Sequence, residues 1–331
     1  MSTRACILGC EGPTLGASEA ARLRALTPWG FILFARNVES PAQVARLVAD
    51  LRAAVGWPAP VLIDQEGGRV QRLTPPHWRA WPPPLDPVPG DRIAAFAARG
   101  RAIGAELAAL GIDVNCAPVA DIAGPDTHPF LHNRCYGTDV ASVTACARAL
   151  AEGLLAAGVL PVMKHLPGHG RARADSHAEL PRVTAPLQVL RDSDFAPFRA
   201  LADLPLAMTA HVVYDALDPD RPATLSPAAI AAIRADIGFD GLLMTDDISM
   251  GALSGPVGAL AAAAIAAGCD IVLHCNGDAG EAEAVADAVG PLTGRAAARA
   301  AVALALRPPG PGDVGPGHGG TVDNAAPPSE P

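Results

Sequence analysis

Eight short apolar segments alternate with eight alanine- and leucine-rich segments along this chain of 331 residues, and the alternation predicts a single-domain α/β fold. The apolar segments have almost no polar residues in their interiors, which is typical of parallel strands buried on both faces. No G-x-G-x-x-G segment follows the first apolar run and no G-x-x-x-x-G-K-[ST] segment occurs, so an open, doubly wound nucleotide-binding sheet is disfavoured. Eight strand–helix units in one chain therefore predict a (β/α)8 barrel, the TIM barrel.

The predicted strands are short, apolar and rich in β-branched residues: 5–10, 30–34, 60–64, 112–117, 160–165, 206–211, 241–246 and 270–274. The predicted helices lie between and after them: 18–27, 41–55, 91–110, 139–158, 186–203, 226–236, 256–267 and 279–305. Three helices have clear start signals, because Ser40 and Ser226 each precede a proline and Asp91 precedes an apolar periodic stretch.

The barrel is expected to occupy residues 1–307. From residue 308 to residue 331, thirteen of twenty-four residues are Pro or Gly. Such a segment cannot bury enough apolar surface to fold, so we expect a disordered C-terminal tail.

Composition excludes several classes of partner. The chain has 25 Lys and Arg against 34 Asp and Glu and no basic patch, so nucleic acid is not expected as a ligand. The longest uncharged apolar stretch, residues 255–269, is too short and too weakly hydrophobic to span a bilayer, so no membrane partner is expected. Residues 5–10 faintly resemble a lipoprotein cleavage site, but a signal peptide needs about 7–15 apolar residues, more than are available here.

The cysteines indicate a compartment. Seven are scattered along the chain without a C-x-x-C pair, so neither a zinc site nor a disulfide framework is expected. A reducing cytoplasm fits this usage best.

Polar residues lie at the carboxyl ends of several predicted strands: Asp64, Asn115, Lys164, His165, His211 and Asp246. In a barrel these ends meet at one opening, where active sites are built, so we expect these residues to share a site. The alternative is that strand ends are polar simply because they leave the core.

Lys164 is the single lysine of the sequence, and all the other residues in the Lys and Arg total are arginines. Surface charge does not require lysine in this chain, which indicates a chemical reason for the one that is present. Chance survival is the alternative.

The third strand runs into Asp64-Gln65-Glu66-Gly67-Gly68-Arg69-Val70-Gln71-Arg72. The two glycines allow a sharp turn that would hold Asp64 and the arginines over the barrel opening. A carboxylate that accepts two hydrogen bonds suits the vicinal hydroxyls of a sugar. Alternatively, Asp64 is a structural partner of Arg69 or Arg72.

The loop after the fifth strand carries His165, His169, Asp175 and His177. The three histidines could join Asp246 around a metal, but no H-x-H or H-E-x-x-H spacing is present. We favour a dyad in which the Asp175 carboxylate reaches the His177 imidazole and raises its basicity, giving a proton donor that works near neutral pH. A solvated Asp–His pair is the alternative.

The seventh strand runs directly into Asp246 and Asp247. An acid at the end of an apolar barrel strand suggests a carboxylate nucleophile, and Asp246 comes first. Asp247 would cap the following turn, and capping is the alternative for both.

Taken in order, the segments IDQEGGRVQR, KHLPGHG, ADSHAELP and LLMTDDISM resemble the glycoside hydrolase family 3 β-N-acetylhexosaminidases, in particular the single-domain bacterial enzymes of peptidoglycan recycling. The resemblance covers about residues 5–300. Larger members of that family carry a second αβ domain that completes the site, so this chain would complete its site alone.

The resemblance implies that Asp246 is the nucleophile and that His177, assisted by Asp175, is the general acid/base. It also implies a sugar-binding set: Asp64, Arg72, Arg134, Lys164 and His165. The family usually has Ser after this arginine, whereas Cys135 follows Arg134 here.

The implied reaction is removal of a terminal β-linked N-acetylglucosamine from anhydro-muropeptides, through a covalent glycosyl-enzyme and with retained configuration. No cofactor, metal or obligate protein partner is implied; the partner is a small glycan. Other possibilities stay open: a β-glucosidase or a phosphorylase on the same site, a metal-dependent barrel hydrolase, and a sugar-binding protein without catalysis.

Overall fold

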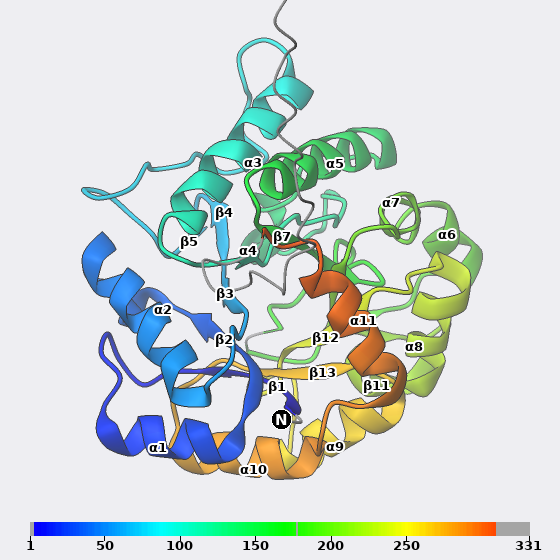
Figure 1. The fold of residues 1–331 in the computed structure, drawn as a ribbon. Helices are drawn as coiled ribbons and strands as arrows, with labels where there is room; N and C mark the ends of the chain where they lie inside the picture. Colours follow the sequence, from blue (N-terminus) through cyan, green and yellow to red (C-terminus); the bar gives the residue numbers. More distant parts are fainter. Residues whose placement is uncertain (1–2, 177, 309–331) are drawn as a thin grey trace, which may run out of the picture.

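The computed structural model describes residues 3–176 and 178–308, and its centre is a closed barrel of eight parallel strands in the order β1-β13-β12-β9-β7-β6-β3-β2. The barrel strands are β1 (Arg4–Gly9), β2 (Pro28–Leu33), β3 (Val61–Ile63), β6 (Val114–Asn115), β7 (Leu160–Leu166), β9 (Leu206–Thr209), β12 (Leu242–Asp247) and β13 (Ile271–His274). Each overlaps one predicted strand, so the (β/α)8 TIM barrel is confirmed. In Figure 1 the helices surround these strands.

The longer helices are α1 (Ala17–Leu26), α2 (Pro41–Val55), α3 (Arg92–Ala108), α5 (Val140–Ala156), α9 (Val257–Ala267), α10 (Ala279–Val289) and α11 (Gly294–Leu304). The shorter ones are α4 (Pro129–His132), α6 (Leu187–Asp192), α7 (Ala196–Ala200), α8 (Pro227–Ala232), the 3-10 turns η1 (Ala35–Asn37) and η2 (Ala223–Leu225), and the π-helical turn η3 (Ile233–Ile237). The three start signals are confirmed: the side chains of Ser40, Asp91 and Ser226 each accept a hydrogen bond from a backbone N–H of the first turn.

Three predicted helices were wrong in extent. Residues 279–305 form two helices, because Gly290, with φ of 65°, and the proline after it interrupt the chain between α10 and α11. Residues 186–203 also divide into two, since the hydroxyl of Ser193 bonds the carbonyl of Val189 where α6 ends. The predicted helix 226–236 changes from α8 into η3.

In the described part of the chain, two small sheets lie outside the barrel and extend the loops at the carboxyl ends of the strands. The first is a hairpin of β4 (Gln65–Gly67) and β5 (Val70–Gln71) directly after β3. The second pairs β10 (Val213–Tyr214) with β8 (Arg182–Val183) and β11 (Asp218–Pro222).

Helices α3 and α5 lie side by side at the top of Figure 1, and glycines let their backbones approach. A methyl group at Gly100 would overlap the carbonyl oxygen of Leu150, and one at Gly153 would overlap that of Ala97. The close contact packs together the helices that precede β6 and β7 in the chain.

No helix in the described ranges is long and apolar enough to cross a membrane. All seven cysteines are free and buried. Of the predicted C-terminal tail, residues 308–331, only Pro308 belongs to the described residues.

Candidate active site

A pocket of about 460 Å3 opens at the carboxyl ends of the barrel strands. Seven of the eight predicted site residues line it: Asp64, Arg72, Arg134, Lys164, His165, Asp175 and Asp246. The eighth, His177, lies outside the described residues, and so does its predicted contact with Asp175. Strand ends and loops far apart in the sequence therefore meet around one cavity.

The hairpin after β3 presents Asp64 to this pocket. Its Oδ2 accepts a hydrogen bond from Arg72 Nη2 at 3.1 Å and its Oδ1 accepts one from Lys164 Nζ at 2.9 Å. Burial alone would raise the pKa of Asp64, but the charges of Lys164 and Arg72 outweigh it and hold that pKa well below its usual range. Asp64 is therefore both a structural partner of Arg72 and an ionised acceptor at the pocket surface.

The turn of the hairpin depends on its two glycines, as predicted. Gly67 and Gly68 have φ of 104° and 60°, in the left-handed region, and a methyl group at Gly67 would overlap the Arg99 guanidinium. The side chain of Gln65 accepts hydrogen bonds from the backbone N–H groups of Arg72 and Leu73, which fixes the returning strand.

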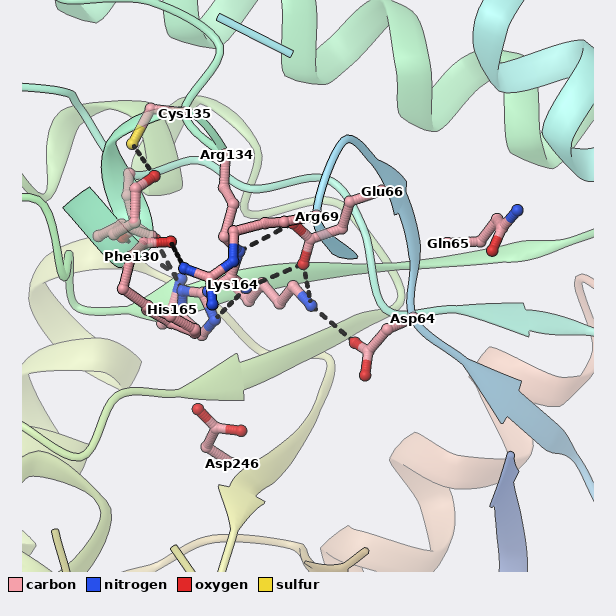
Figure 2. Close-up of polar contacts among 12 residues, drawn as sticks. Asp64, Gln65, Glu66, Arg69, Phe130, Arg134, Cys135, Lys164, His165 and Asp246 are labelled. Carbon is pink, nitrogen blue, oxygen red and sulfur yellow. Dashed lines mark hydrogen bonds and ion pairs between the residues drawn. The ribbon is translucent and has the colours of Figure 1, made fainter. Parts of the chain in front are cut away.

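Glu66 lies beneath the pocket and organises two of its cations (Figure 2). It receives two hydrogen bonds of 2.9 Å from Arg134 and lies 2.6 Å from Lys164 Nζ. Burial opposes its ionisation, but Arg134 and Lys164 lower the pKa of Glu66. In turn, Glu66 more than offsets the cost of burying Arg134 and raises the pKa of that guanidinium. The paired geometry holds the arginine plane rigidly beside the pocket.

Lys164 is buried between Asp64 and Glu66, with 2% of its side chain exposed. Burial disfavours the ammonium, yet the two carboxylates raise the pKa of Lys164 above its usual range, so it stays charged. Lys164 and the adjacent His165 both line the pocket, which a regular strand would not permit. The register of β7 against β9 shifts between Met163 and Leu166, and this irregularity interrupts the alternation.

His165 is oriented by Asp121, whose Oδ2 lies 2.7 Å from His165 Nδ1. The other oxygen, Oδ1, accepts the backbone N–H of His169 at 2.6 Å. Burial raises the pKa of Asp121, but His165 reverses the shift and lowers it. One buried carboxylate thus fixes His165 and the start of the loop after β7, where His169 Nε2 lies 3.3 Å from Ser176 Oγ.

Asp246 lies near the carboxyl end of β12 and faces the charged cluster across the pocket (Figure 2). Its Oδ1 accepts the backbone N–H of Asp247 at 2.8 Å. Burial would raise the pKa of Asp246, but His165, the N–H of Asp247 and Lys164 outweigh this effect and lower it, so the carboxylate is ionised. The side chain of Asp247 accepts the N–H of Ser249, which confirms the expected cap of the following turn.

Two of the predicted strand-end residues do not line the pocket. The Asn115 side chain exchanges two hydrogen bonds with the backbone of Gln65, at 3.0 and 3.1 Å, and so holds the hairpin that carries Asp64. His211 is fully buried and contacts Thr224 and the backbone of Asp247. The expectation that all the strand-end residues share one site was wrong for Asn115 and His211. Both lie behind the residues that line the pocket.

Sequence reasoning gave no role to Glu66 or Asp121. Glu66 stands inside a quoted motif, but acids in glycine-rich loops are usually exposed, and nothing in the sequence marks this one as buried. Asp121 did carry a signal, because it is a single acid in the apolar run 116–123, and an acid in such a run must be paired if it is buried.

Within the described ranges, no group of three or more His, Cys, Asp and Glu side chains is arranged to hold a metal ion. The alternative metal site invoked His165, His169, His177 and Asp246. In the structure His165 Nδ1 contacts Asp121, and His177 lies outside the described residues.

Comparison with known proteins gives the same family that the motifs resemble. Residues 18–303 match the Glycosyl hydrolase family 3 N terminal domain. The Beta-hexosaminidase of Bordetella avium (strain 197N) is 38% identical over 278 residues, which are 80% of this chain and 78% of that protein.

Solved structures have the same fold. NagZ from Neisseria gonorrhoeae in complex with N-trifluoroacetyl-D-glucosamine aligns with a TM-score of 0.83 and 30% identity over 93% of this chain and 91% of that one. A family 3 β-N-acetylglucosaminidase from Paenibacillus sp. str. FPU-7 also gives 0.83, with 31% identity over 92% of this chain, which spans 61% of that longer protein. With a family match over most of its length, this chain belongs to glycosyl hydrolase family 3.

Proposed function

We propose that this chain is a retaining exo-β-N-acetylglucosaminidase that removes terminal β-linked N-acetylglucosamine from peptidoglycan fragments. The observation that carries the proposal is the pocket, in which an ionised, half-buried Asp246 faces a fixed set of hydrogen-bond donors and acceptors. The names of the relatives support the substrate class: one is called a Beta-hexosaminidase, and the gonococcal NagZ structure holds an N-acylated glucosamine.

In the proposed mechanism Asp246 Oδ attacks the anomeric carbon while His177 gives its proton to the leaving glycosidic oxygen. The bond from Asp246 to the sugar forms as the bond to the leaving group breaks. His177 then takes a proton from water, which attacks the same carbon and releases the sugar with retained configuration. Asp175 assists His177.

The remaining pocket residues would bind the sugar that is being removed. Asp64 can accept from two vicinal hydroxyls, because each of its oxygens keeps a lone pair beyond its bond to Lys164 or Arg72. Lys164, Arg134 and His165 supply donors whose positions are fixed by Glu66 and Asp121. Donors held in place before the substrate arrives cost little reorganisation during the reaction.

The substrate we propose is N-acetylglucosamine linked to anhydro-N-acetylmuramic acid, with or without peptide, cleaved in the cytoplasm during cell-wall recycling. Seven free, buried cysteines agree with a reducing compartment.

The test is release of para-nitrophenol from the β-N-acetylglucosaminide and from the β-glucoside, in parallel, with and without EDTA. Turnover of the N-acetyl substrate alone, unchanged by EDTA, is expected. Turnover of the glucoside alone would keep the family and overturn the substrate, and loss with EDTA would favour the metal-dependent alternative. Formation of a sugar phosphate when phosphate is added to the assay would identify a phosphorylase. If the protein binds sugar but turns over neither glycoside nor a muropeptide, it is a sugar-binding protein without catalysis.

A further inference from the structure

His211 is the strand-end histidine to which the proposed mechanism gives no role. It follows β9, is fully buried, and does not line the pocket. Its ring nevertheless contacts the backbone of Asp247, the residue directly after the proposed nucleophile.

The hydrogen bonds of the ring define its protonation. His211 Nε2 lies 2.9 Å from the carbonyl oxygen of Asp247, and because a carbonyl oxygen can only accept, Nε2 must carry a hydrogen. Burial lowers the pKa of His211 although the charge of Asp246 opposes the shift, so the ring is neutral near pH 7. A neutral ring with its hydrogen on Nε2 has a lone pair on Nδ1.

The lone pair on Nδ1 faces a hydroxyl that can donate to it. Thr224 Oγ1 lies 2.7 Å from His211 Nδ1, closer than the 3.1 Å that separates it from the carbonyl oxygen of Ala210. When Thr224 donates to Nδ1, its oxygen can accept from the Thr209 hydroxyl at 2.8 Å. The carbonyl of Asp247 thus selects the tautomer of His211, and the Thr224 hydroxyl fits it, because this hydroxyl can give its hydrogen to Nδ1 in place of the Ala210 carbonyl.

Asp247 is fixed from its side chain as well. Its Oδ1 accepts hydrogen bonds from the N–H and the hydroxyl of Ser249, at 3.1 and 2.8 Å, and from the N–H of Cys275 at 3.1 Å. Held by its carbonyl and its carboxylate, Asp247 directs its own N–H at Asp246 Oδ1, 2.8 Å away.

We propose that His211 is a positioning residue for the nucleophile: as the neutral Nε2–H tautomer it holds the carbonyl of Asp247 and so fixes the backbone N–H that orients the Asp246 carboxylate. The inference rests on the proposed function in one respect, that Asp246 is the nucleophile.

The kinetic test compares His211→Leu with His211→Gln. Leucine has a similar volume and no polar hydrogen, whereas glutamine keeps an N–H that can reach the Asp247 carbonyl. We expect His211→Leu to lower kcat on the aryl β-N-acetylglucosaminide by about 10²-fold with KM changed by less than about threefold, because a misplaced nucleophile slows bond formation and leaves sugar binding intact. His211→Gln should recover at least about tenfold of that loss.

Equal losses in the two variants, or a rise in KM with kcat unchanged, would overturn the positioning role. Thermal unfolding of both variants shows whether they fold. If His211→Leu does not fold, Thr224→Val replaces it, because valine matches the shape of threonine and removes the donor to Nδ1; it is expected to lower kcat in the same way.

A second measurement needs no substrate. Two-bond 1H–15N spectra of the histidines, with His211 assigned by comparison with His211→Gln, report which ring nitrogen carries the hydrogen. We expect the neutral Nε2–H tautomer from about pH 7 to pH 8. An Nδ1–H tautomer or an imidazolium in this range contradicts the inference. Absence of any glycosidase activity in the unmodified protein would reject the proposed function instead, and the spectra would still decide the state of His211.

Discussion

Glu66 and Lys164 form a buried ion pair, with 2.6 Å between Glu66 Oε1 and Lys164 Nζ and at most 2% of either side chain exposed. Lys164 lines the pocket, whereas Glu66 lies beneath it. The pair is part of a row in which Asp64, Lys164, Glu66 and Arg134 alternate in charge (Figure 2). Each charge in this row is compensated by its neighbours, and these ion pairs fix the positions of the charged side chains at the pocket.

We expect Glu66→Gln to lower the free energy of unfolding by about 3–5 kcal/mol, because it leaves the buried Arg134 without a charged partner. Urea unfolding measures this change. Asp203→Asn is the matched control, since the Asp203–Arg148 pair is on the surface and its loss should cost less than about 1 kcal/mol. Equal costs for the two variants would show that Glu66 is not a structural partner of the cations.

The single lysine allows a chemical test of the same row. Lys164 is buried and protonated, and both properties suppress the reaction of an amine with an electrophile. We therefore expect reductive methylation of the native protein to modify the N-terminal amine and leave Lys164 unmodified, whereas the protein in denaturant gains both modifications. Intact mass spectrometry counts them. Rapid modification of Lys164 in the folded protein would contradict its burial.

Much of the fold could be predicted because strands of a buried parallel sheet are marked by continuous apolar runs. Helix ends were harder to predict. In residues 279–305, Gly290 and Pro291 stand within an otherwise helical composition, and the local break divides the segment into two helices. The short sheet of β8, β10 and β11 was not predicted, because strands of two to five residues have too little periodicity to detect.

The part of the candidate site that could be predicted consists of polar residues at the ends of apolar strands, which can be recognised in the sequence. Asp64, Lys164 and Asp246 stand where apolar strands stop, so their meeting at one opening follows from barrel geometry. Glu66 and Asp121 could not be assigned, since their importance comes from partners more than forty residues away in the chain. Tertiary packing decides which strand-end residues line the pocket and which, like His211, are buried behind the pocket-lining residues.

The stability of the protein should depend on His169 in mildly acidic solution. Burial, with the charge of His165, lowers the pKa of His169 from 6.5 to about 4. Between these pH values the unfolded chain binds a proton that the native state does not, so the free energy of unfolding falls as pH decreases from 6.5 to about 4. This group alone accounts for about 3 kcal/mol over that interval.

Urea unfolding at a series of pH values measures that dependence. His169→Gln, whose side chain does not titrate, should lose this part of the slope, and His77→Gln, at an exposed position, should keep it. A slope in His169→Gln equal to that of the unmodified protein would show that another group is responsible. Carboxylates with lowered pKa values, such as Asp64, act at lower pH, because stability from such a group is present above its unfolded pKa and is lost as pH falls below it.

The catalytic assignment predicts different defects for its two principal residues. Asp246→Ala should abolish turnover of every glycoside, because no bond to the sugar can form. His177→Ala should lower kcat/KM most for poor leaving groups and least for a dinitrophenolate, which departs without a proton. A series of aryl β-N-acetylglucosaminides of graded leaving-group pKa measures the difference as a steeper dependence in the variant.

Added azide separates the two steps. It attacks a covalent glycosyl-enzyme without needing a general base, so it should raise kcat of His177→Ala and yield the β-glycosyl azide. Asp246→Ala forms no glycosyl-enzyme, so it should give no β-glycosyl azide, and formation of that product by Asp246→Ala would contradict the assignment. Equal losses of kcat/KM on good and poor leaving groups would contradict His177 as the acid. An α-configured azide product formed by Asp246→Ala would still identify Asp246 as the nucleophile, since azide would then occupy the place of the missing carboxylate.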